Sequence, residues 1–124
     1  MKHNPPLQTA AHKVITDLIL TPDKKYLLTG GDDGEAKIWD LAKRSLVKTI
    51  PAHKQKLLGF AMSPDGKTFA SNGQDQEVKL WETDTGKELH HWTGMDIRGM
   101  VFTPEGKHLA TANKNTTLYL LECP

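Results

Sequence analysis

The residues of this sequence that could do chemistry are an acidic, glycine-rich run, six histidines and one cysteine. The run, at residues 30–34, is GGDDG. It lacks the G-x-G-x-x-G spacing of a dinucleotide-binding loop, and it leads into residues 35–39, EAKIW, which alternate as in a strand. A calcium loop of regularly spaced oxygen ligands is also missing. Asp32, Asp33 and Gly34 instead predict a tight hairpin turn, in which glycine supplies the positive φ.

The histidines do not follow a metal-binding pattern. His90 and His91 are adjacent, so on a strand their side chains point to opposite faces. His3 and His108 are isolated in the sequence. No pair of carboxylates is placed for acid–base chemistry either. We therefore expect no metal, no cofactor and no enzymatic activity.

Composition favours one small domain without nucleic-acid or membrane partners. The 124 residues include 16 Lys and Arg against 15 Asp and Glu, and no basic stripe stands out. No segment has the apolar length of a signal peptide or a membrane span. Cys123 is the single cysteine, which excludes an internal disulfide. We expect a soluble, cytoplasmic protein.

One sequence pattern occurs three times. It is LLTGGDDGEAKIWD at residues 27–40, FASNGQDQEVKLWE at 69–82 and, less closely, LATANKNTTLYLLE at 109–122. A proline turn precedes each copy, and the three turns begin at Thr21, Ser63 and Thr103. The spacings between these turns are 42 and 40 residues. Self-similarity at such a period indicates a repeat architecture, in which each copy is one supersecondary unit.

Each unit is predicted to hold four short strands. Residues 14–20 are rich in β-branched and apolar residues, are too few for a helix, and end at a proline turn. The expected strands are 14–20, 26–30, 35–39 and 45–50 in the first unit, 57–62, 68–72, 77–81 and 88–93 in the second, and 97–102, 108–112 and 117–121 in the third. The third unit lacks a fourth strand. Residues 6–11, however, precede His12 as the fourth strand of the first unit precedes His53, which predicts an extra outer strand.

The strongest anchors of the repeat are a histidine and a tryptophan. His12 and His53 are 41 residues apart, and Trp39 and Trp81 are 42 apart. Each tryptophan is followed by an acidic residue and lies 27 or 28 residues after its histidine. From about residue 6 to its end, the chain resembles the WD-repeat family of β-propellers, with two good copies and one degenerate copy. The resemblance implies four-stranded antiparallel blades.

The resemblance also implies a side-chain network in each blade, made by a histidine, a strand hydroxyl, a turn aspartate and the tryptophan. In this sequence its members are His12, Thr29, Asp33 and Trp39 in the first blade and His53, Ser71, Asp75 and Trp81 in the second. A carboxylate and a hydroxyl satisfy both nitrogens of a buried imidazole. Such a set resembles a catalytic triad, but a hydrolase needs one set that opens on a cleft, and here it is duplicated with the repeat. We interpret both sets as structural.

The third unit departs from this pattern. Thr111 is kept, but Asn115 replaces the aspartate, Leu121 the tryptophan, and Met95 or Gly94 the histidine. Loss of both partners of a buried hydrogen bond costs less than loss of one. We therefore expect the whole polar network to be absent from this unit, with Trp92 filling part of the vacated space.

The fold predicted from these observations is an all-β propeller with three four-stranded antiparallel blades per chain. Three blades leave bare apolar faces and an open edge at 117–121, whereas closed rings use about four to eight blades. We therefore expect a homodimer that closes a six-bladed ring; a trimer would hold nine blades. The half-propeller spans 1–124, with 6–11 as outer strand for a neighbouring chain, 12–52 as blade 1, 53–93 as blade 2, and 94–124 as blade 3 without its own outer strand.

The expected function is a protein-interaction scaffold that holds a protein or peptide on its top face. The resemblance implies this use, at the end where the histidine loops meet the turns between second and third strands. The candidate rim residues, of mixed charge, are Lys13, Asp32, Lys54, Gln74, Asp96, Arg98 and Lys114. Two alternatives stay open: a structural module or fragment of a larger polypeptide without independent activity, and an enzyme with a site at the central channel.

Overall fold

The computed structural model describes residues 12–124, which form eleven β-strands. The strands are β1 (Ile15–Leu20), β2 (Tyr26–Gly31), β3 (Ala36–Asp40), β4 (Ser45–Ile50), β5 (Leu57–Met62), β6 (Thr68–Gly73), β7 (Val78–Glu82), β8 (Glu88–Trp92), β9 (Ile97–Phe102), β10 (His108–Asn113) and β11 (Leu118–Glu122). They pair as three antiparallel sheets with the orders β1-β2-β3-β4, β5-β6-β7-β8 and β9-β10-β11. We call these sheets blades 1, 2 and 3.

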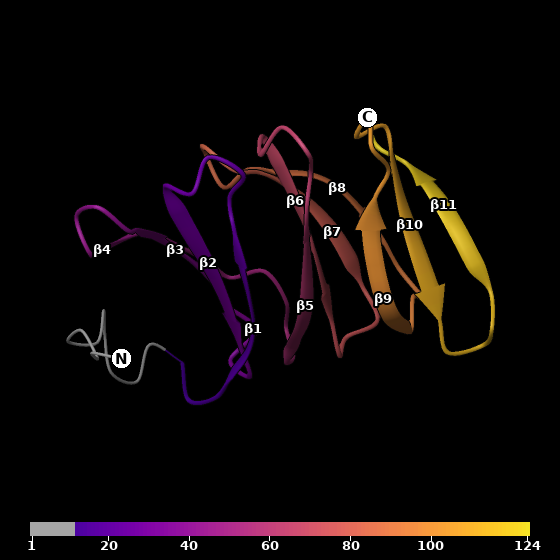
Figure 1. Cartoon of the computed structure of the whole chain (residues 1–124). Coiled ribbons are helices and arrows are strands. Elements are labelled where there is room, and N and C mark those ends of the chain that lie inside the picture. Colours follow the sequence, from indigo (N-terminus) through magenta and orange to yellow (C-terminus); the bar gives the residue numbers. More distant parts are fainter. Residues whose placement is uncertain (1–11) are drawn as a thin grey trace, which may run out of the picture.

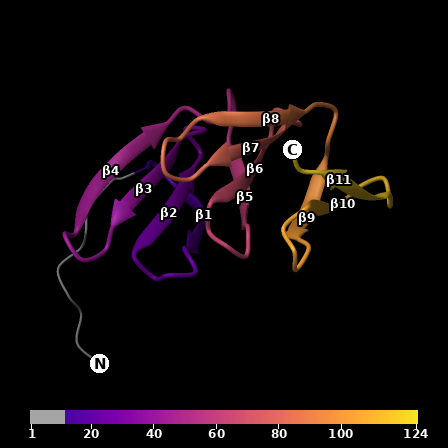
Figure 2. The same cartoon turned by 90° about the horizontal axis from the view of Figure 1, so that it is seen from above.

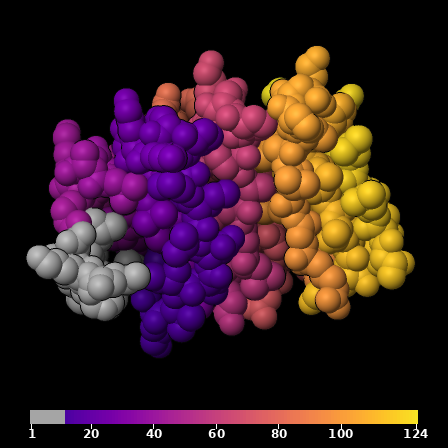
Figure 3. All heavy atoms as spheres, viewed as in Figure 1, coloured from indigo at the N-terminus to yellow at the C-terminus, as the bar shows by residue number. Residues whose placement is uncertain are grey.

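The blades stand in a row in chain order, so that blades 1 and 3 occupy its two ends (Figure 1). The first strands are neighbours, since β5 contacts both β1 and β9. Seen from above, β4 and β8 lie on the outer side of an arc (Figure 2). The space-filling view shows the three sheets in contact along the row (Figure 3).

All three blades keep one register, which makes their positions comparable. Opposite residues of the second and third strands are Leu28 and Ile38 in blade 1, Ala70 and Leu80 in blade 2, and Ala110 and Leu120 in blade 3. The first strand of every blade also contains a bulge at the same place. A side chain in one blade therefore has a defined counterpart in the next.

The proline turns are closed by side chains as well as by backbone. In blade 1 the Thr21 hydroxyl donates to Asp23 Oδ1 at 2.7 Å, and the same oxygen accepts the Lys25 N–H at 2.9 Å. Ser63 and Asp65 form the same pair in blade 2 at 2.7 Å. These hydrogen bonds lower the pKa of Asp23, because they stabilise its ionised form. The repeated Thr/Ser-Pro-Asp sequence thus fixes the connection between first and second strands.

The apolar core lies between the blades rather than within them. Blades 1 and 2 share a cluster that includes Leu28, Ile38, Leu57, Phe60, Phe69 and Trp81. The Phe69 ring is fully buried and stacks on Trp81, with 6.4 Å between the ring centroids. Blades 2 and 3 share a second cluster that includes Val78, Leu80, Met95, Ile97, Phe102 and Leu109. Each sheet therefore buries apolar side chains on the faces that meet a neighbour.

The prediction of an all-β fold with three antiparallel sheets is confirmed. The strand boundaries differ from the predicted ones by a residue or so; β2, for example, continues to Gly31. Blade 3 has three strands within the described residues. The outer strand predicted over 6–11 lies outside the described residues.

Candidate functional site

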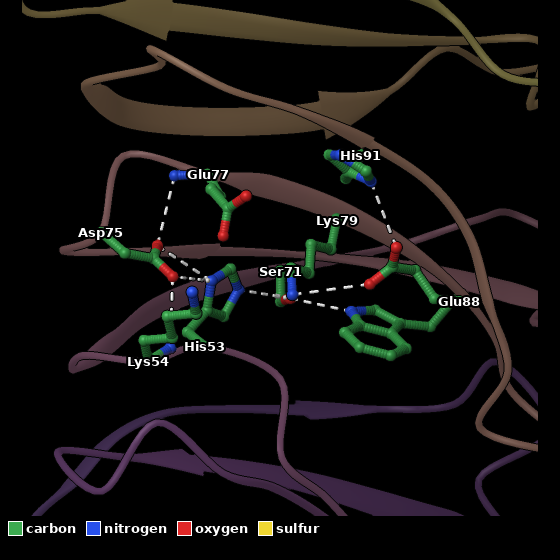
Figure 4. A network of polar contacts seen from close by, with 9 residues as sticks. His53, Lys54, Ser71, Asp75, Glu77, Lys79, Glu88 and His91 are labelled. Atoms are coloured by element: carbon green, nitrogen blue, oxygen red, sulfur yellow. Dashed lines mark hydrogen bonds and ion pairs between the residues drawn. The ribbon is translucent and has the colours of Figure 1, made fainter.

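The histidine network of blade 2 joins all four of its predicted members (Figure 4). His53 Nδ1 lies 3.1 Å from Asp75 Oδ1, and its Nε2 lies 2.8 Å from Ser71 Oγ. The same hydroxyl accepts a hydrogen bond from Trp81 Nε1–H at 2.9 Å. Ser71 is fully buried and His53 is 6% exposed. The network thus ties the loop before β5 to β6 and β7.

Asp75 extends this network to the main chain. Its Oδ2 accepts the Lys54 N–H and its Oδ1 accepts the Glu77 N–H, both at 3.2 Å. One carboxylate therefore holds the loop before β5 and the β6–β7 turn together. On the outer strands β7 and β8 of this blade, Lys79 Nζ and His91 Nδ1 lie 3.5 and 3.2 Å from the Glu88 carboxylate (Figure 4).

Blade 1 repeats the network. His12 Nδ1 lies 3.1 Å from Asp33 Oδ1, His12 Nε2 lies 2.9 Å from Thr29 Oγ1, and Trp39 Nε1–H donates to the same hydroxyl at 2.9 Å. The aspartate differs in its exposure: the side chain of Asp33 is 33% exposed and that of Asp75 is 9% exposed. The blade 2 network is therefore the better shielded of the two.

The hydrogen-bond directions show what this set can do chemically. An indole N–H only donates, so the Ser71 oxygen accepts from Trp81 and its own hydrogen points to His53 Nε2. His53 then carries its proton on Nδ1, toward Asp75. Hydroxyl, imidazole and carboxylate follow the order of a Ser-His-Asp triad. The hydroxyl, however, is fully buried and committed on two sides, so that the set has no accessible nucleophile.

One histidine and one aspartate of the two networks have lowered pKa values. Burial lowers the pKa of His53, and the Asp75 carboxylate opposes this effect without outweighing it. For Asp33, burial acts to raise the pKa, but hydrogen bonds from the Glu35 N–H and from His12 hold it below its ordinary value. The lowered pKa favours the neutral form of His53, and the lowered pKa of Asp33 favours its ionised form.

A glycine lies against each of these histidines. A Cβ added to Gly73 would be 2.6 Å from His53 Nδ1, and one added to Gly31 would be closer still to the His12 ring. A Cβ cannot approach that closely, so a histidine in this place requires glycine at the end of the second strand. This coupling explains why both well-conserved copies of the repeat in this chain end their second strand in glycine.

In blade 3, both the histidine and the glycine of this pair are replaced. Met95 and Asn113 stand where blade 2 has the histidine and the glycine. Asn113 is 7% exposed, and its Nδ2 donates to Thr111 Oγ1 at 3.3 Å and to the Thr117 carbonyl at 3.2 Å. The prediction that this unit loses its whole polar network is therefore wrong in part, because Asn113 gives the Thr111 hydroxyl a new partner. The signal was an asparagine at a position where both other copies have glycine.

The remaining substitutions of blade 3 are accommodated locally. Asn115 Oδ1 accepts the Thr117 N–H at 3.0 Å, as Asp33 Oδ1 accepts the Glu35 N–H in blade 1. The turn therefore keeps its side-chain support. Trp92 and Leu121 both pack against the apolar cluster that contains Met95.

The seven predicted rim residues are spread over all three blades, on the loops before the first strands, on the turns between the second and third strands and, for Arg98, at the start of β9. Backbone hydrogen bonds join these loops in every blade: Asp32 N–H to Val14 O, Gln74 N–H to Lys56 O, and Lys114 N–H to Asp96 O. Lys114 Nζ also lies 3.5 Å from Asp96 Oδ1. All seven side chains are exposed except that of Asp32, which is half-buried and accepts the Val14 N–H at 3.1 Å. The structure thus brings the set to one rim, with Asp32 partly engaged in holding its own loop.

Blade 3 is flanked by an open groove. It lies between β8 and β11, has a volume of about 1030 Å³, and is lined by Trp92, His108, Leu120, Leu121 and Cys123, among others. Burial raises the pKa of the Cys123 thiol, which keeps it protonated and unreactive at neutral pH. The thiol at this groove is therefore not an activated nucleophile.

The described residues were compared with the requirements of a metal site and of a membrane-spanning helix. Within 12–124, no three histidine, cysteine or acidic side chains come together as metal ligands. No helix in that same part of the chain is long and apolar enough to cross a membrane.

The family follows from comparison of the sequence with known proteins. The family model described as "WD domain, G-beta repeat" matches residues 4–40 and 44–82, together more than half of the chain. The chain belongs to the WD-repeat family. Blade 3 of this WD-repeat protein lies outside both matches, in agreement with its altered network.

Two curated relatives of this WD-repeat protein match it over short segments. A ribosome biogenesis protein BOP1 homolog from Culex quinquefasciatus is 41% identical over 51 residues, which is 38% of this chain and 6% of that protein. Coatomer subunit beta'-1 from Arabidopsis thaliana is 52% identical over 31 residues, 25% of this chain and 3% of that protein. The chain thus spans only a small part of the length of these relatives.

The blade 2 network predicts a specific cost for loss of its hydroxyl. Ser71→Ala removes the partner of both His53 Nε2 and Trp81 Nε1–H, so the free energy of unfolding should fall by about 1–3 kcal/mol. Thr111→Val in blade 3 is the matched control, because it removes an equally buried hydroxyl with a single partner and keeps the side-chain shape. Urea unfolding measures both. Equal losses in the two variants would contradict this account.

The lowered pKa of His53 predicts acid sensitivity near neutral pH. The unfolded chain takes up a proton at an imidazole pKa of about 6.5, whereas the folded chain does so only at lower pH. The contribution of His53 is therefore complete above that pH and is lost as the pH falls below it. Urea unfolding between about pH 8 and pH 5 should show this decrease, and His53→Gln should flatten it. Asp33 acts only at much lower pH, through its own depressed pKa.

Proposed function

We propose that this WD-repeat chain is a protein-interaction scaffold that holds a protein or peptide at the loop end of its blades. The observation that carries the proposal is the difference between the buried and the exposed polar side chains. Side chains with catalytic potential, such as Ser71 and His53, are buried and hydrogen-bonded inside the blades, while the rim carries exposed charges of both signs. Mixed charges on a rigid backbone favour a polar protein interface over a nucleic-acid groove.

The relatives support an interaction role in one respect. The Arabidopsis relative is, by its name, a subunit of coatomer and therefore part of a multi-protein assembly. We extend only the general role to this chain. We also propose the cytoplasm as its location, because its single cysteine cannot form an internal disulfide.

The scaffold that we propose is a ring made of two copies, and its first support is the free face of blade 1. Ile15 and Leu18 are 51% and 59% exposed. The same positions in blade 2 are Leu57 and Phe60, which are 0% and 8% exposed because they pack on blade 1. In blade 3, Ile97 at the first of these positions is 6% exposed. Blade 1 thus carries the residues of a covered face without a cover in the described structure.

The free face of blade 3 gives the second support. Leu118 and Leu120 are 74% and 61% exposed. Their counterparts in blade 2, Val78 and Leu80, are 0% and 1% exposed, because blade 3 covers them. Leaving several such side chains in water forgoes about 1.5–3 kcal/mol for each one that could be buried.

The free faces of blade 1 and blade 3 are complementary in the residues that they carry. The blade 1 face carries the residue types that elsewhere in the chain pack onto the equivalent of the blade 3 face. The front of one copy therefore fits the back of another, as blade 2 fits blade 1. Such head-to-tail contacts close into a ring when the rotation permits. Two copies give six blades, within the usual range of about four to eight, and three copies give nine.

A longer polypeptide that supplies further blades is the alternative. The same faces would then be covered by its own neighbouring repeats, and this chain would be one structural segment of a larger propeller. The small share of the relatives that the chain matches is compatible with this alternative. The mass of the assembly in solution distinguishes the two-copy ring from a segment of a longer polypeptide.

The two-copy ring predicts a mass in solution of twice 13.8 kDa by analytical ultracentrifugation. Leu18→Asp or Leu120→Asp should give monomers, because each places a charge in the contact between copies. Leu58→Asp is the control: Leu58 is 40% exposed, and the other blades have Thr16 and Arg98 at its position. A folded wild-type monomer would refute the two-copy ring and favour the longer polypeptide.

The scaffold role predicts a partner that depends on the rim. Wild-type protein immobilised in a lysate of the source cell should retain a discrete protein, and Lys54→Glu with Arg98→Glu should weaken its retention by reversing two exposed charges. Lys43→Glu, exposed in the loop between β3 and β4 at the opposite end, is the matched control. Recovery of the chain alone, or equal retention by both variants, would count against the scaffold role.

A further inference from the structure

A small hollow lies between blades 1 and 2 on the side of the protein that carries the proline turns and the C-terminus (Figure 1). This side is opposite the rim. The hollow has a volume of about 150 Å³. Blade 1 lines it with its proline turn and Tyr26, and blade 2 lines it with its own proline turn, Thr83 and Asp84. All of these residues belong to one copy of the chain, so the hollow does not depend on the two-copy ring.

Thr83 brings an unsatisfied hydroxyl to the wall of this hollow. The residue is 8% exposed, and its Oγ1 has no hydrogen-bond partner among the described residues. The side chain also lines a second hollow of about 70 Å³, which Tyr26, Val47 and Lys48 border. Buried hydroxyls in proteins are nearly always hydrogen-bonded. The Thr83 oxygen is therefore suited to accept a hydrogen bond from a group that enters from outside.

The repeat itself does not require a hydroxyl at this position. The Thr83 N–H donates to the Lys67 carbonyl, and the same main-chain hydrogen bond identifies Leu41 in blade 1 and Cys123 in blade 3 as its counterparts. The residue after it is Asp84 in blade 2, but alanine in blade 1 and proline in blade 3. Among the described residues, Asp84 forms no hydrogen bond or ion pair. The fold therefore does not account for this hydroxyl and carboxylate.

The charge around the hollow is mainly negative. Asp23, Asp65 and Asp84 line it, together with one basic residue, Lys67. The turn hydrogen bonds of Asp23 and Asp65 all go to Oδ1, so each carboxylate keeps its second oxygen for another donor. These hydrogen bonds also lower the pKa of both side chains, because they stabilise the ionised form. A cation is the complementary ligand.

We propose that this hollow binds the guanidinium group of an arginine from a protein partner. Three carboxylates and a buried hydroxyl offer more acceptors than the three N–H donors of a lysine can use, whereas a guanidinium has five donors in one plane. Within residues 12–124, no acidic side chains come together closely enough to hold a metal ion, which favours an extended cation. The Tyr26 ring adds an aromatic surface of the kind that attracts cations.

The size of the hollow limits the ligand to a single head group. Its volume is about the share of five water molecules in the liquid, which is too small for a length of main chain. The remainder of the partner has a place beside it. Asp65 and Asp84 also line a groove of about 570 Å³ between blades 2 and 3, to which Glu82 and Glu105 add further negative charge. The site therefore fits an arginine within a basic segment.

An NMR titration of the full chain with the peptide acetyl-Gly-Arg-Gly-amide tests this proposal. The backbone N–H signals of Thr83 and Asp84 should shift, while those of Lys54 and Lys114 at the rim should not. The same peptide with citrulline keeps the side-chain shape without the charge, and it should bind at least about tenfold more weakly. The lysine peptide should bind about threefold more weakly, because it offers fewer donors.

Two variants and a matched control locate the site. Thr83→Val removes the hydroxyl and keeps the side-chain shape, so the Kd of the arginine peptide should rise about threefold. Urea unfolding of this variant without peptide should show no loss of stability, because its hydroxyl has no partner to lose. Asp84→Asn should also raise the Kd about threefold. Glu105→Gln is the control and should leave the Kd unchanged, because Glu105 lines the groove between blades 2 and 3 but not the hollow.

Several results would overturn the proposal. They are the absence of shifts with the arginine peptide, equal binding of the citrulline peptide, and equal effects of Asp84→Asn and Glu105→Gln. Equal binding of the lysine peptide would overturn the assignment to a guanidinium. A loss of stability in Thr83→Val would show that the hydroxyl serves the fold. None of these measurements involves the rim or the mass of the assembly, so a failure of the proposed scaffold or ring is distinguishable from a failure of this site.

Discussion

The structure depends on one constraint: each blade carries apolar side chains on both faces of its sheet. In blade 2, Leu57 and Phe60 face blade 1, while Val78 and Leu80 face blade 3. A single blade would leave all of them in water, at about 1.5–3 kcal/mol for each side chain. A blade is therefore stabilised by a neighbour on each face. The sharing of the core between successive blades follows from this two-sidedness.

In blades 1 and 2, a buried hydrogen-bond network fixes the loops that the apolar core does not reach. The buried hydroxyl of Ser71 connects an indole and an imidazole, and the aspartate beyond the imidazole binds main-chain N–H groups on two loops. A fully satisfied buried network of this kind rigidifies its surroundings. The loops of the rim are thus fixed by buried side chains, while most of the rim side chains themselves stay exposed.

Much of this fold could be predicted from the sequence, because the repeat displays its own period. The three hairpins, the proline turns and the members of two networks are all carried by residues that recur at fixed spacing. Asn113 was missed, because its role depends on the loss of a histidine some eighteen positions earlier, and only the packing shows that the two side chains occupy one space. The bulge that skips Val47 was missed for a similar reason. Which residues pair across strands is set by hydrogen bonding, and no residue type marks it.

The altered network of blade 3 has a consequence for how this end of the row is held. In blades 1 and 2, a histidine links the loop before the first strand to the second and third strands. In blade 3 the bonds of Asn113 stay within β10 and the turn that follows, so they do not hold the Met95 loop. That loop is fixed by the backbone hydrogen bonds from Met95 N–H to Gln76 O and from Lys114 N–H to Asp96 O, and by packing of Met95 and Ile97 against blade 2. Backbone pairing and apolar packing against a neighbour are therefore enough to place a blade whose loop has no histidine link.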